Sequence, residues 1–380
     1  MTALSRRHLL TAAAAVLPAS ALLAACGPGK VRGAAPSGQA AGALPLVGLQ
    51  MAGTTDGWAA GGATVYRTTD GARTFTEVSP PARPTAGAIV LQVLGSSAAW
   101  AAMAAATGVS VYRTADGGTA WTAAALPSAA GLVPRFLAAS SGGSHGWLWS
   151  SQGISGAAAG ALHATTDGGK TWSLLGTAGT AAGALPTSGG KTGLAFGDAR
   201  HGVVCGAGSQ KGMPWIYATA DGGTTWTAAH MPIAAPYHGD VLSLQFPTFF
   251  DARHGAVFLF AGSGSVPTAI PYTSADGGAS WTAALPIASP HAAPTISYVG
   301  AQRWFASDGV GIYATENAGA AWNGFLATPP RVLQGITVLD FVSPSMGFAL
   351  IPGGLGPRGR APTALVQTVD AGQSWGPAGS

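Results

Sequence analysis

Short apolar runs separated by polar, Gly-rich turns organise most of the chain. Residues 244–283 show the pattern: the apolar run LQFPTFF, the turn DARHG, the run AVFLFAG, a Gly/Pro loop, the segment AIPYTSA, the turn DGGAS and the start of another strand at WTA. Apolar runs of this length, bounded by Gly, Pro, Asp and Ser, are typical of β-strands joined by tight turns. The segment therefore predicts four short antiparallel strands.

The third of these turns recurs along the chain. Residues 165–172 read TTDGGKTW, and six related stretches occur at intervals of 41 to 55 residues. Aligned on the acidic position, the seven copies are centred on Asp70, Asp116, Asp167, Asp221, Asp276, Asn317 and Asp370. Each copy lies among similar apolar runs, which indicates seven repeats of one four-stranded unit.

One four-stranded sheet cannot bury both of its faces, whereas seven sheets packed around an axis can. The sequence therefore predicts an all-β fold: a seven-bladed β-propeller of four-stranded antiparallel blades over residues 45–380. Each repeat supplies its own four strands, so we expect the propeller to close by packing, without a strand exchanged between the two ends.

The acid at the centre of each repeated turn has a structural explanation. A short carboxylate can accept backbone N–H groups of its own turn, and we expect these groups to be buried. The adjacent glycines supply positive φ, Thr171 adds a hydroxyl, and Trp172 packs inward at the start of the outer strand. A calcium loop would need several acids at alternating positions and a later Glu. Each turn has one acid, so we predict structural turns and no metal.

The repeated stretch resembles the Asp-box, or bacterial neuraminidase repeat, with the pattern S/T-x-D-x-G-x-[ST]-W. With the preceding D-x-x-x-G turn and Gly-Trp strand, the pattern over residues 45–377 resembles photosystem II assembly factor-like propellers and related repeat lipoproteins of the sialidase superfamily. Departures from the pattern are Ala72, Ala120, Glu316, Asn317 and Ala321. Sialidases, xyloglucanases, sortilin and assembly factors share the box, so the resemblance implies the fold and leaves the function open.

The N-terminal region reads as an export signal followed by a tether. A basic head, MTALSRRH, precedes an apolar stretch over residues 9–24, and the sequence Leu23-Ala24-Ala25-Cys26-Gly27 resembles a lipoprotein lipobox. We expect residues 1–25 to be a lipoprotein signal peptide. Residues 26–44 then form a lipidated Cys26 and a flexible Gly/Ala/Pro/Ser tether. Ser5-Arg6-Arg7 resembles a twin-arginine signal, with the general secretory route as the alternative.

This interpretation places the protein on the extracytoplasmic face of the cell membrane, and it changes the charge balance. Removing residues 1–25 leaves sixteen Lys and Arg against fourteen Asp and Glu, a net charge of +2. That value, with no run of basic residues, argues against a nucleic-acid partner. The remaining cysteine, Cys205, lies in the apolar run HGVVCGAG and is expected to be a small buried residue, not a nucleophile.

Candidate binding residues stand before the predicted inner strands, where loops surround the mouth of the central funnel. Asp198 and Asp251, with Arg200, His201, Arg253 and His254, instead belong to the opposite face with the boxes, as solvated turns. The loops at the mouth carry Arg83, Arg135, Lys191, Tyr237, His238, Asp240, His291 and Arg331. We select as the binding site Arg135, Tyr237, His238, Asp240, His291 and Arg331. The alternative is that these loops are polar only because they are hydrated.

Three functions fit these features. The first is a non-catalytic protein-binding or assembly scaffold, the second a ligand-sensing ectodomain, and the third a sialidase-like glycoside hydrolase. A sialidase needs three arginines, for which Arg83, Arg135 and Arg331 are the candidates, together with working carboxylates. However, Glu77 follows a box and Glu316 lies inside one. The sequence therefore favours a monomeric scaffold with a protein partner, no cofactor and no catalytic residue.

Overall fold

The computed structural model describes residues 38–40, 42, 44–140, 142–153, 159–262, 267–287, 291–351, 353, 355–356, 359–360 and 363–378. The expected signal peptide, the lipidated Cys26 and most of the tether lie outside these residues. A search of the described part of the chain finds no helix that combines the length and the apolar character needed to cross a membrane.

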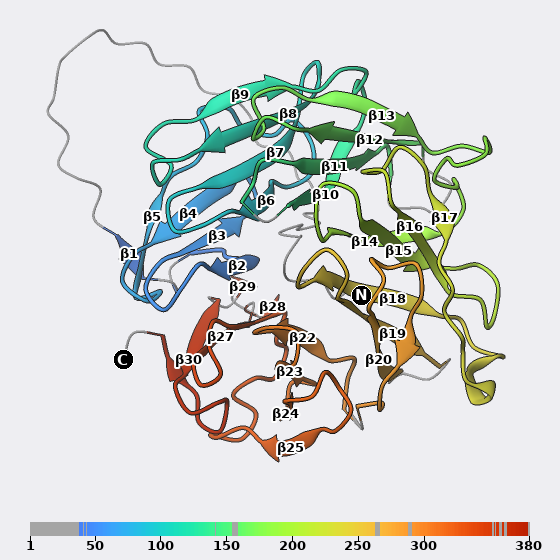
Figure 1. Ribbon diagram of the computed structural model, residues 1–380. Coiled ribbons are helices and arrows are strands. Elements are labelled where there is room, and N and C mark those ends of the chain that lie inside the picture. The colour runs from blue at the N-terminus through green and yellow to red at the C-terminus, as the bar shows by residue number, and fades with distance from the viewer. Residues whose placement is uncertain are drawn as a thin grey trace, which may run out of the picture.

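Seven antiparallel blades follow one another around a central axis in the described part of the chain (Figure 1). Blades 1 to 3 are β2 (Gly48–Met51), β3 (Gly57–Gly61), β4 (Thr64–Thr68) and β5 (Thr74–Glu77); β6 (Val90–Val93), β7 (Ala99–Ala105), β8 (Gly108–Thr114) and β9 (Thr122–Ala125); and β10 (Val133–Ala139), β11 (Gly146–Ser151), β12 (Gly160–Thr165) and β13 (Ser173–Thr177). The prediction of seven four-stranded blades is thereby confirmed for this half of the propeller.

The second half repeats this strand order, and one backbone pair, between Ala207 and Ser243, joins blades 4 and 5. Blades 4 to 7 are β14 (Gly190–Phe196), β15 (Gly202–Ala207), β16 (Trp215–Thr219) and β17 (Thr227–Ala228); β18 (Ser243–Phe249), β19 (Gly255–Ala261), β20 (Thr268–Ser274) and β21 (Thr282–Ala283); β22 (Thr295–Tyr298), β23 (Trp304–Ser307), β24 (Gly311–Thr315) and β25 (Asn323–Leu326); and β26 (Val338–Phe341), β27 (Gly347–Ile351), β30 (Ala364–Thr368) and β31 (Gly376–Pro377). A small hairpin, β28 (Leu355–Gly356) with β29 (Gly359–Arg360), is inserted in blade 7.

Chain order within a blade is also radial order, with the first strand next to the axis and the fourth at the rim (Figure 1). Burial follows this order: all seven residues of β19 are buried, whereas four of the five residues of the outer strand β13 are exposed. Because the middle strands are covered on both faces by neighbouring blades, they read as continuous apolar runs in the sequence.

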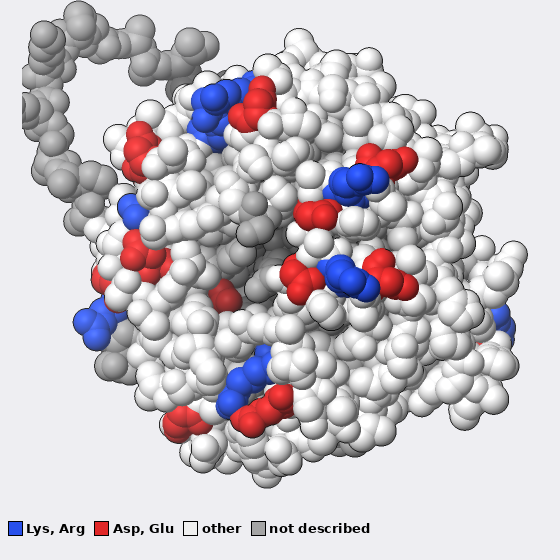
Figure 2. Space-filling model, in the orientation of Figure 1, with Lys and Arg blue, Asp and Glu red and all other residues white. Residues whose placement is uncertain are grey.

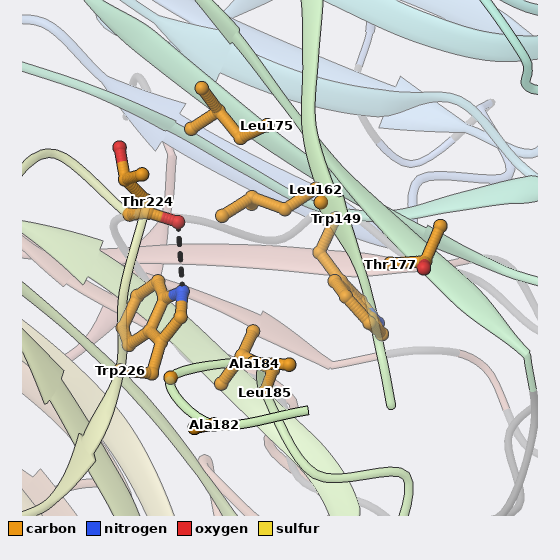
Figure 3. Close-up of a pocket in the computed structure, with 12 residues that line it drawn as sticks. Trp149, Leu162, Leu175, Thr177, Ala182, Ala184, Leu185, Thr224 and Trp226 are labelled. Carbon is orange, nitrogen blue, oxygen red and sulfur yellow. Dashed lines mark hydrogen bonds between the residues drawn. The ribbon is translucent and has the colours of Figure 1, made fainter. Parts of the chain in front are cut away.

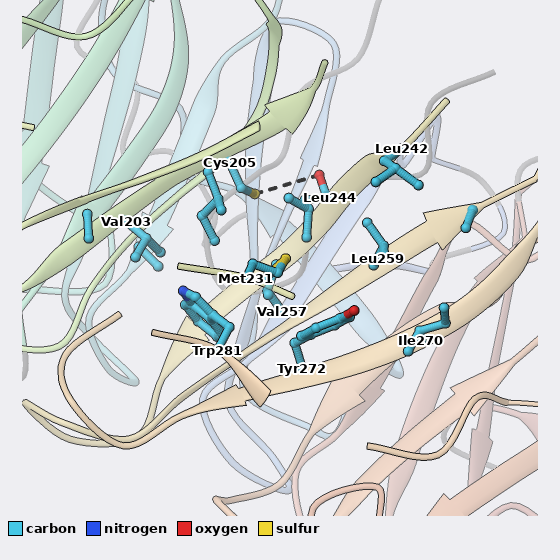
Figure 4. Close-up of a cluster of buried hydrophobic side chains, with 14 of the residues drawn as sticks. Val203, Cys205, Met231, Leu242, Leu244, Val257, Leu259, Ile270, Tyr272 and Trp281 are labelled. Atoms are coloured by element: carbon cyan, nitrogen blue, oxygen red, sulfur yellow. Dashed lines mark hydrogen bonds between the residues drawn. The ribbon is translucent and has the colours of Figure 1, made fainter. Parts of the chain in front are cut away.

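The core consists of apolar clusters between successive blades. Figure 4 shows the cluster between blades 4 and 5, where Val203 and Cys205 of β15 face Leu244, Val257 and other residues of blade 5. The Cys205 thiol is fully buried and donates to the Leu244 carbonyl over 3.6 Å. Burial raises the pKa of this thiol to about 12. The prediction of a buried, unreactive cysteine is confirmed.

The repeated turn has a common set of hydrogen bonds, which the blade-4 copy shows in full. The Thr219 hydroxyl donates to Asp221 Oδ1 over 2.8 Å and accepts the buried N–H of Gly223 over 2.9 Å. Asp221 accepts the Thr225 N–H over 2.9 Å and the Thr225 hydroxyl over 2.6 Å. The turn is therefore closed by one carboxylate and one hydroxyl acting together.

These bonds correct one expectation about the acid. The buried N–H of each turn is accepted by the preceding Thr or Ser hydroxyl, while the acid accepts exposed groups, as Asp167 does from Thr171. The departures in blades 2 and 6 are local: Ala120 and Ala321 lose the hydroxyl bond but still donate their N–H groups over 3.0 and 2.8 Å. In blade 6 the acceptor is the amide oxygen of Asn317.

Blades 7 and 1 meet without exchanging a strand among the described residues. The Met51 N–H donates to Asp340 Oδ2 over 2.6 Å, and the Thr363 hydroxyl donates to the Leu46 carbonyl over 3.4 Å. Leu46 also packs in one buried cluster with Phe348 and neighbouring side chains of blade 7. The chain before blade 1 forms β1 (Gln39–Ala40), which pairs with β5 of the same blade. Among the described residues the ends are joined by packing and by side-chain hydrogen bonds, and the expected absence of an exchanged strand is confirmed.

Three other contacts between neighbouring blades share a feature that the sequence pattern did not predict. The carbonyl of a proline in the connection that follows an outer strand accepts a hydrogen bond from a side chain of the next blade. His163 Nε2 lies 2.7 Å from the Pro127 oxygen, Lys191 Nζ 2.9 Å from that of Pro186, and Tyr272 Oη 2.9 Å from that of Pro232. Because proline has no N–H to donate to a strand ladder, it also ends the pairing of the segment in which it lies.

Replacing Thr219 by Val should destabilise the protein by about 1–3 kcal/mol, because the buried Gly223 N–H loses its acceptor. Thr225→Ala is the matched control, since Ala stands at the equivalent position in blades 2 and 6. We expect this control to cost less, because its backbone bond to Asp221 remains. Chemical unfolding of both variants measures the difference. A Thr225→Ala variant as unstable as Thr219→Val would contradict this account of the turn.

The carboxylates of the turns should make stability fall in acid. Backbone N–H groups of His254 and Arg253 lower the pKa of Asp251 to about 2, from an ordinary value of 3.8. Because the folded-state pKa is the lower one, this contribution is complete above about pH 3.8 and is lost as the pH falls toward 2. Melting temperatures measured from pH 6 to pH 2 should drop in that window. Asp251→Asn should show a shallower drop, and an identical slope would refute the assignment.

Candidate functional site

Strand order gives the propeller two different faces. In each blade the N–H that follows the box acid donates to a carbonyl in the turn between the first two strands, for example from Gly222 to Arg200 over 2.8 Å and from Gly277 to Arg253 over 2.9 Å. These turns and the boxes therefore share one face, here called the box face. The loops before the first strands and between the second and third strands lie on the opposite face, here called the funnel face.

The charged residues of the two DARHG turns on the box face bind one another and the neighbouring turns. Asp198 Oδ1 accepts the N–H groups of Arg200 and His201 over 2.8 and 2.6 Å, and the Arg200 side chain donates to the Ala220 carbonyl over 3.2 Å. The DARHG copy in blade 5 makes the same set of bonds. Figure 2 shows basic and acidic side chains beside one another in small mixed groups on the face in view. These groups serve as turn structure, as the sequence predicted.

On the funnel face, Arg135 is the candidate residue nearest the axis. It belongs to the inner strand β10, and its Nε donates to the Ser151 hydroxyl over 3.2 Å. The side chain is half-buried, and burial lowers the pKa of its guanidinium. Arg135 is therefore held against its own blade.

Tyr237, His238 and Asp240 form one compact group before β18. Tyr237 ends a single 3₁₀ turn, η2 (Ala235–Tyr237), and packs against the blade 4–5 core. One ring nitrogen of His238, Nε2, lies 2.9 Å from the Ile233 carbonyl. The Asp240 carbonyl accepts the N–H of Gly212 over 2.8 Å, which ties this segment to the loop between β15 and β16.

His291 and Arg331 lie at other blades. His291 Nδ1 is 2.9 Å from Asp308 Oδ2, in the turn between β23 and β24. Burial raises the pKa of the Asp308 carboxyl. Hydrogen bonds from the Gly311 N–H and from His291 lower this pKa by more than burial raises it, so the net shift is downward. Arg331 is exposed, with φ of 65°, in the loop between β25 and β26. Three of the six candidate residues thus lie together before β18, and Arg135, His291 and Arg331 lie at other blades of the same face.

Lys191, at the mouth in the sequence analysis, is held in place by its surroundings. Its ammonium donates to the carbonyl of Pro186 and lies 3.4 Å from that of Ser188. It also lies 5.4 Å from the centre of the Trp149 ring and 4.7 Å from that of Trp215. Lys191 therefore binds a loop and two indoles of its own chain.

Sequence reasoning missed two apolar residues of the funnel face. Met213 is 58% exposed and Val241 is 51% exposed. They are the immediate neighbours of Gly212 and Asp240, whose backbone bond brings the two loops together. The signal in the sequence was a large apolar residue directly beside polar loop residues, in KGMP and GDVL.

Both glutamates, which the sequence analysis weighed as working carboxylates, form ion pairs with arginines. Glu77, at the end of the outer strand β5, pairs with Arg83 over 2.8 Å, and both side chains are exposed. Glu316 lies in the blade-6 box, where it pairs with Arg303. The described residues also contain no group of three or more His, Cys, Asp or Glu side chains placed to hold a metal ion.

No protein-family model matches the chain, and neither does any curated protein. Among solved structures it is similar to YCF48 bound to D1 peptide, with 17% identity over 86% of this chain and 92% of that chain and a TM-score of 0.54. YCF48 from Cyanidioschyzon merolae gives 15% identity over 86% and 95% of the two chains, with a TM-score of 0.48. A GH74 enzyme from Niastella koreensis gives 14% identity over 89% and 63%, with a TM-score of 0.37.

The first of these similarities agrees with the blades and turns described above. The chain is a β-propeller whose blades carry the repeated Asp-box turn. Its fold is that of the solved YCF48 structure, as the sequence resemblance predicted. An identity of 17% shows a shared fold and says nothing about the binding partner of this chain. The partner is therefore inferred from the surface of this chain.

Proposed function

We propose that the protein is a non-catalytic scaffold, lipid-anchored through Cys26 on the extracytoplasmic face of the cell membrane, that binds a protein partner. The contact surface lies on the funnel face over blades 4 and 5. It is formed by Met213, Val241, His238 and Asp240, here called the blade 4–5 patch. Arg135, His291 and Arg331 extend the same face toward blades 3, 6 and 7.

The observation that carries this proposal is the pair of exposed apolar side chains on two joined loops. Met213 and Val241 are both more than half exposed, although large apolar side chains of this kind are usually buried in the core. The Gly212 N–H to Asp240 carbonyl bond holds their loops together, so the patch is preformed. A preformed surface loses less conformational entropy when a partner binds.

The chemistry of the patch suits a protein better than other partners. Apolar side chains beside directional polar groups are the composition of protein interfaces, and methionine adapts to the shape of a partner. A nucleic acid or an anionic lipid surface would call for a cluster of Lys and Arg. The solved YCF48 structure is named as bound to D1 peptide, so a propeller of this fold offers a surface to a peptide in that protein.

Substituting Met213 and Val241 together by Ser should reduce partner binding about tenfold, which corresponds to about 1.4 kcal/mol. Pull-down from detergent-solubilised membranes first identifies the partner, and titration of the purified pair then gives the dissociation constant. Leu326→Ser is the control, because Leu326 is 72% exposed on the outer strand of blade 6. Equal weakening by both variants, or by neither, would sink the assignment of the patch.

A Cys26→Ser variant tests the anchor separately. We expect it to leave the membrane fraction or to remain unprocessed, because the thiol that carries the lipid is gone. Metabolic acyl labelling and membrane fractionation measure both effects, and the propeller itself should melt unchanged. Acyl label that persists on the Ser variant would contradict the lipobox assignment, while leaving the partner-binding patch untouched.

A further inference from the structure

A cavity of about 200 Å³ lies between blades 3 and 4, away from the blade 4–5 patch (Figure 3). Its walls come from β11, β12 and β13, from the connection between β13 and β14, and from the box of blade 4. The large side chains that line it are Trp149, Leu162, Leu175, Leu185 and Trp226. Two indoles and three leucines thus surround one space.

The walls of this cavity are fixed by hydrogen bonds. Trp226 Nε1 donates to the Gly223 carbonyl over 3.0 Å, as the dashed line in Figure 3 shows. The backbone N–H of Trp226 donates to the Gly183 carbonyl over 2.8 Å, and the Gly179 N–H donates to that of Leu185 over 2.9 Å. The indole of Trp226 and the connecting loop therefore keep their positions without an occupant.

Lys191 supports the cavity from outside. Its ammonium lies over the Trp149 ring and donates to the Pro186 carbonyl, directly after the wall residue Leu185. One cation thus fixes an aromatic wall and the loop that faces it. Burial lowers the pKa of Lys191 to about 8, and the carbonyl oxygens and indole faces favour its charged form.

The lining determines what the cavity can hold. It has no charged side chain, and its polar side chains are the hydroxyls of Thr177 and Thr224. A charged ligand would find no side chain of opposite charge there, and only the side of the pocket at Gly176, Thr177, Ala182 and Thr224 is open to water. An engineered apolar cavity of about 150 Å³ binds benzene, so a space somewhat larger accommodates a single aromatic ring or a small bicyclic one. Flat indole walls favour a flat, apolar occupant.

We propose that the blade 3–4 cavity is a binding site for a small, uncharged aromatic molecule between benzene and indole in size. Lys191 is the positioning residue that holds its walls. The site adds a ligand-binding function to the scaffold and does not depend on the blade 4–5 patch.

Titration of the purified full-length chain with 5-fluoroindole, followed by fluorine NMR, tests the site. We expect saturable broadening and a shift of the probe signal, with one class of site. Ala184→Phe should abolish this signal, because Ala184 lines the cavity and the added ring fills it. Ala283→Phe, on the exposed outer strand β21, is the matched control and should bind as the unaltered chain does. Binding by Ala184→Phe equal to that control would overturn the site, as would no saturable binding by the unaltered chain.

Lys191→Met tests the positioning role. We expect probe affinity to fall about tenfold while the melting profile stays cooperative, and Lys191→Arg should recover part of the affinity because a guanidinium also stacks on indole. Unchanged affinity in Lys191→Met would contradict the positioning role of Lys191, because the walls would then be held by the other hydrogen bonds alone. A phenylalanine-containing tripeptide with blocked ends is the second probe. Tighter binding of that peptide than of 5-fluoroindole would overturn the free small molecule as the occupant.

Discussion

A buried hydroxyl at the end of each third strand controls the geometry of its blade. The hydroxyl accepts the N–H that the turn buries and donates to the acid two residues later, as Thr219 does with Gly223 and Asp221. That acid then closes the exposed half of the turn. The aromatic residue that follows is placed to cover the joint with the neighbouring blade, so one small side chain positions both the outer strand and part of the core.

The joints between blades carry the rest of the stability, and they are chemically diverse. The Asp340 carboxylate links blades 7 and 1. In three other joints, proline carbonyls accept hydrogen bonds from the side chains of His163, Lys191 and Tyr272. Apolar clusters lie beneath these bonds. Since each joint buries side chains from two sheets, no single blade has a complete core of its own.

The repeat was readable from the sequence because its determinants are local. A box, its glycines and the DARHG turn act within a few residues, so blade number, strand order, and the faces of Asp198 and Asp251 followed from spacing alone. Contacts between blades were not readable. Asp340 reaches Met51 across 289 residues, and Lys191 meets Trp149 only after two blades pack. Strand order assigns the six candidate residues to the funnel face, but the contacts that each makes, such as that of Arg135 with Ser151, were not predicted.

The joint between blades 7 and 1 has a consequence for the history of the chain. Among the described residues the two ends meet by packing and side-chain bonds, and no sheet contains strands from both ends. Because each repeat supplies all four strands of its own blade, its duplication or deletion would leave no unpaired strand. Propellers closed in this way can therefore change blade number in single genetic steps, whereas a sheet shared between both termini would resist them.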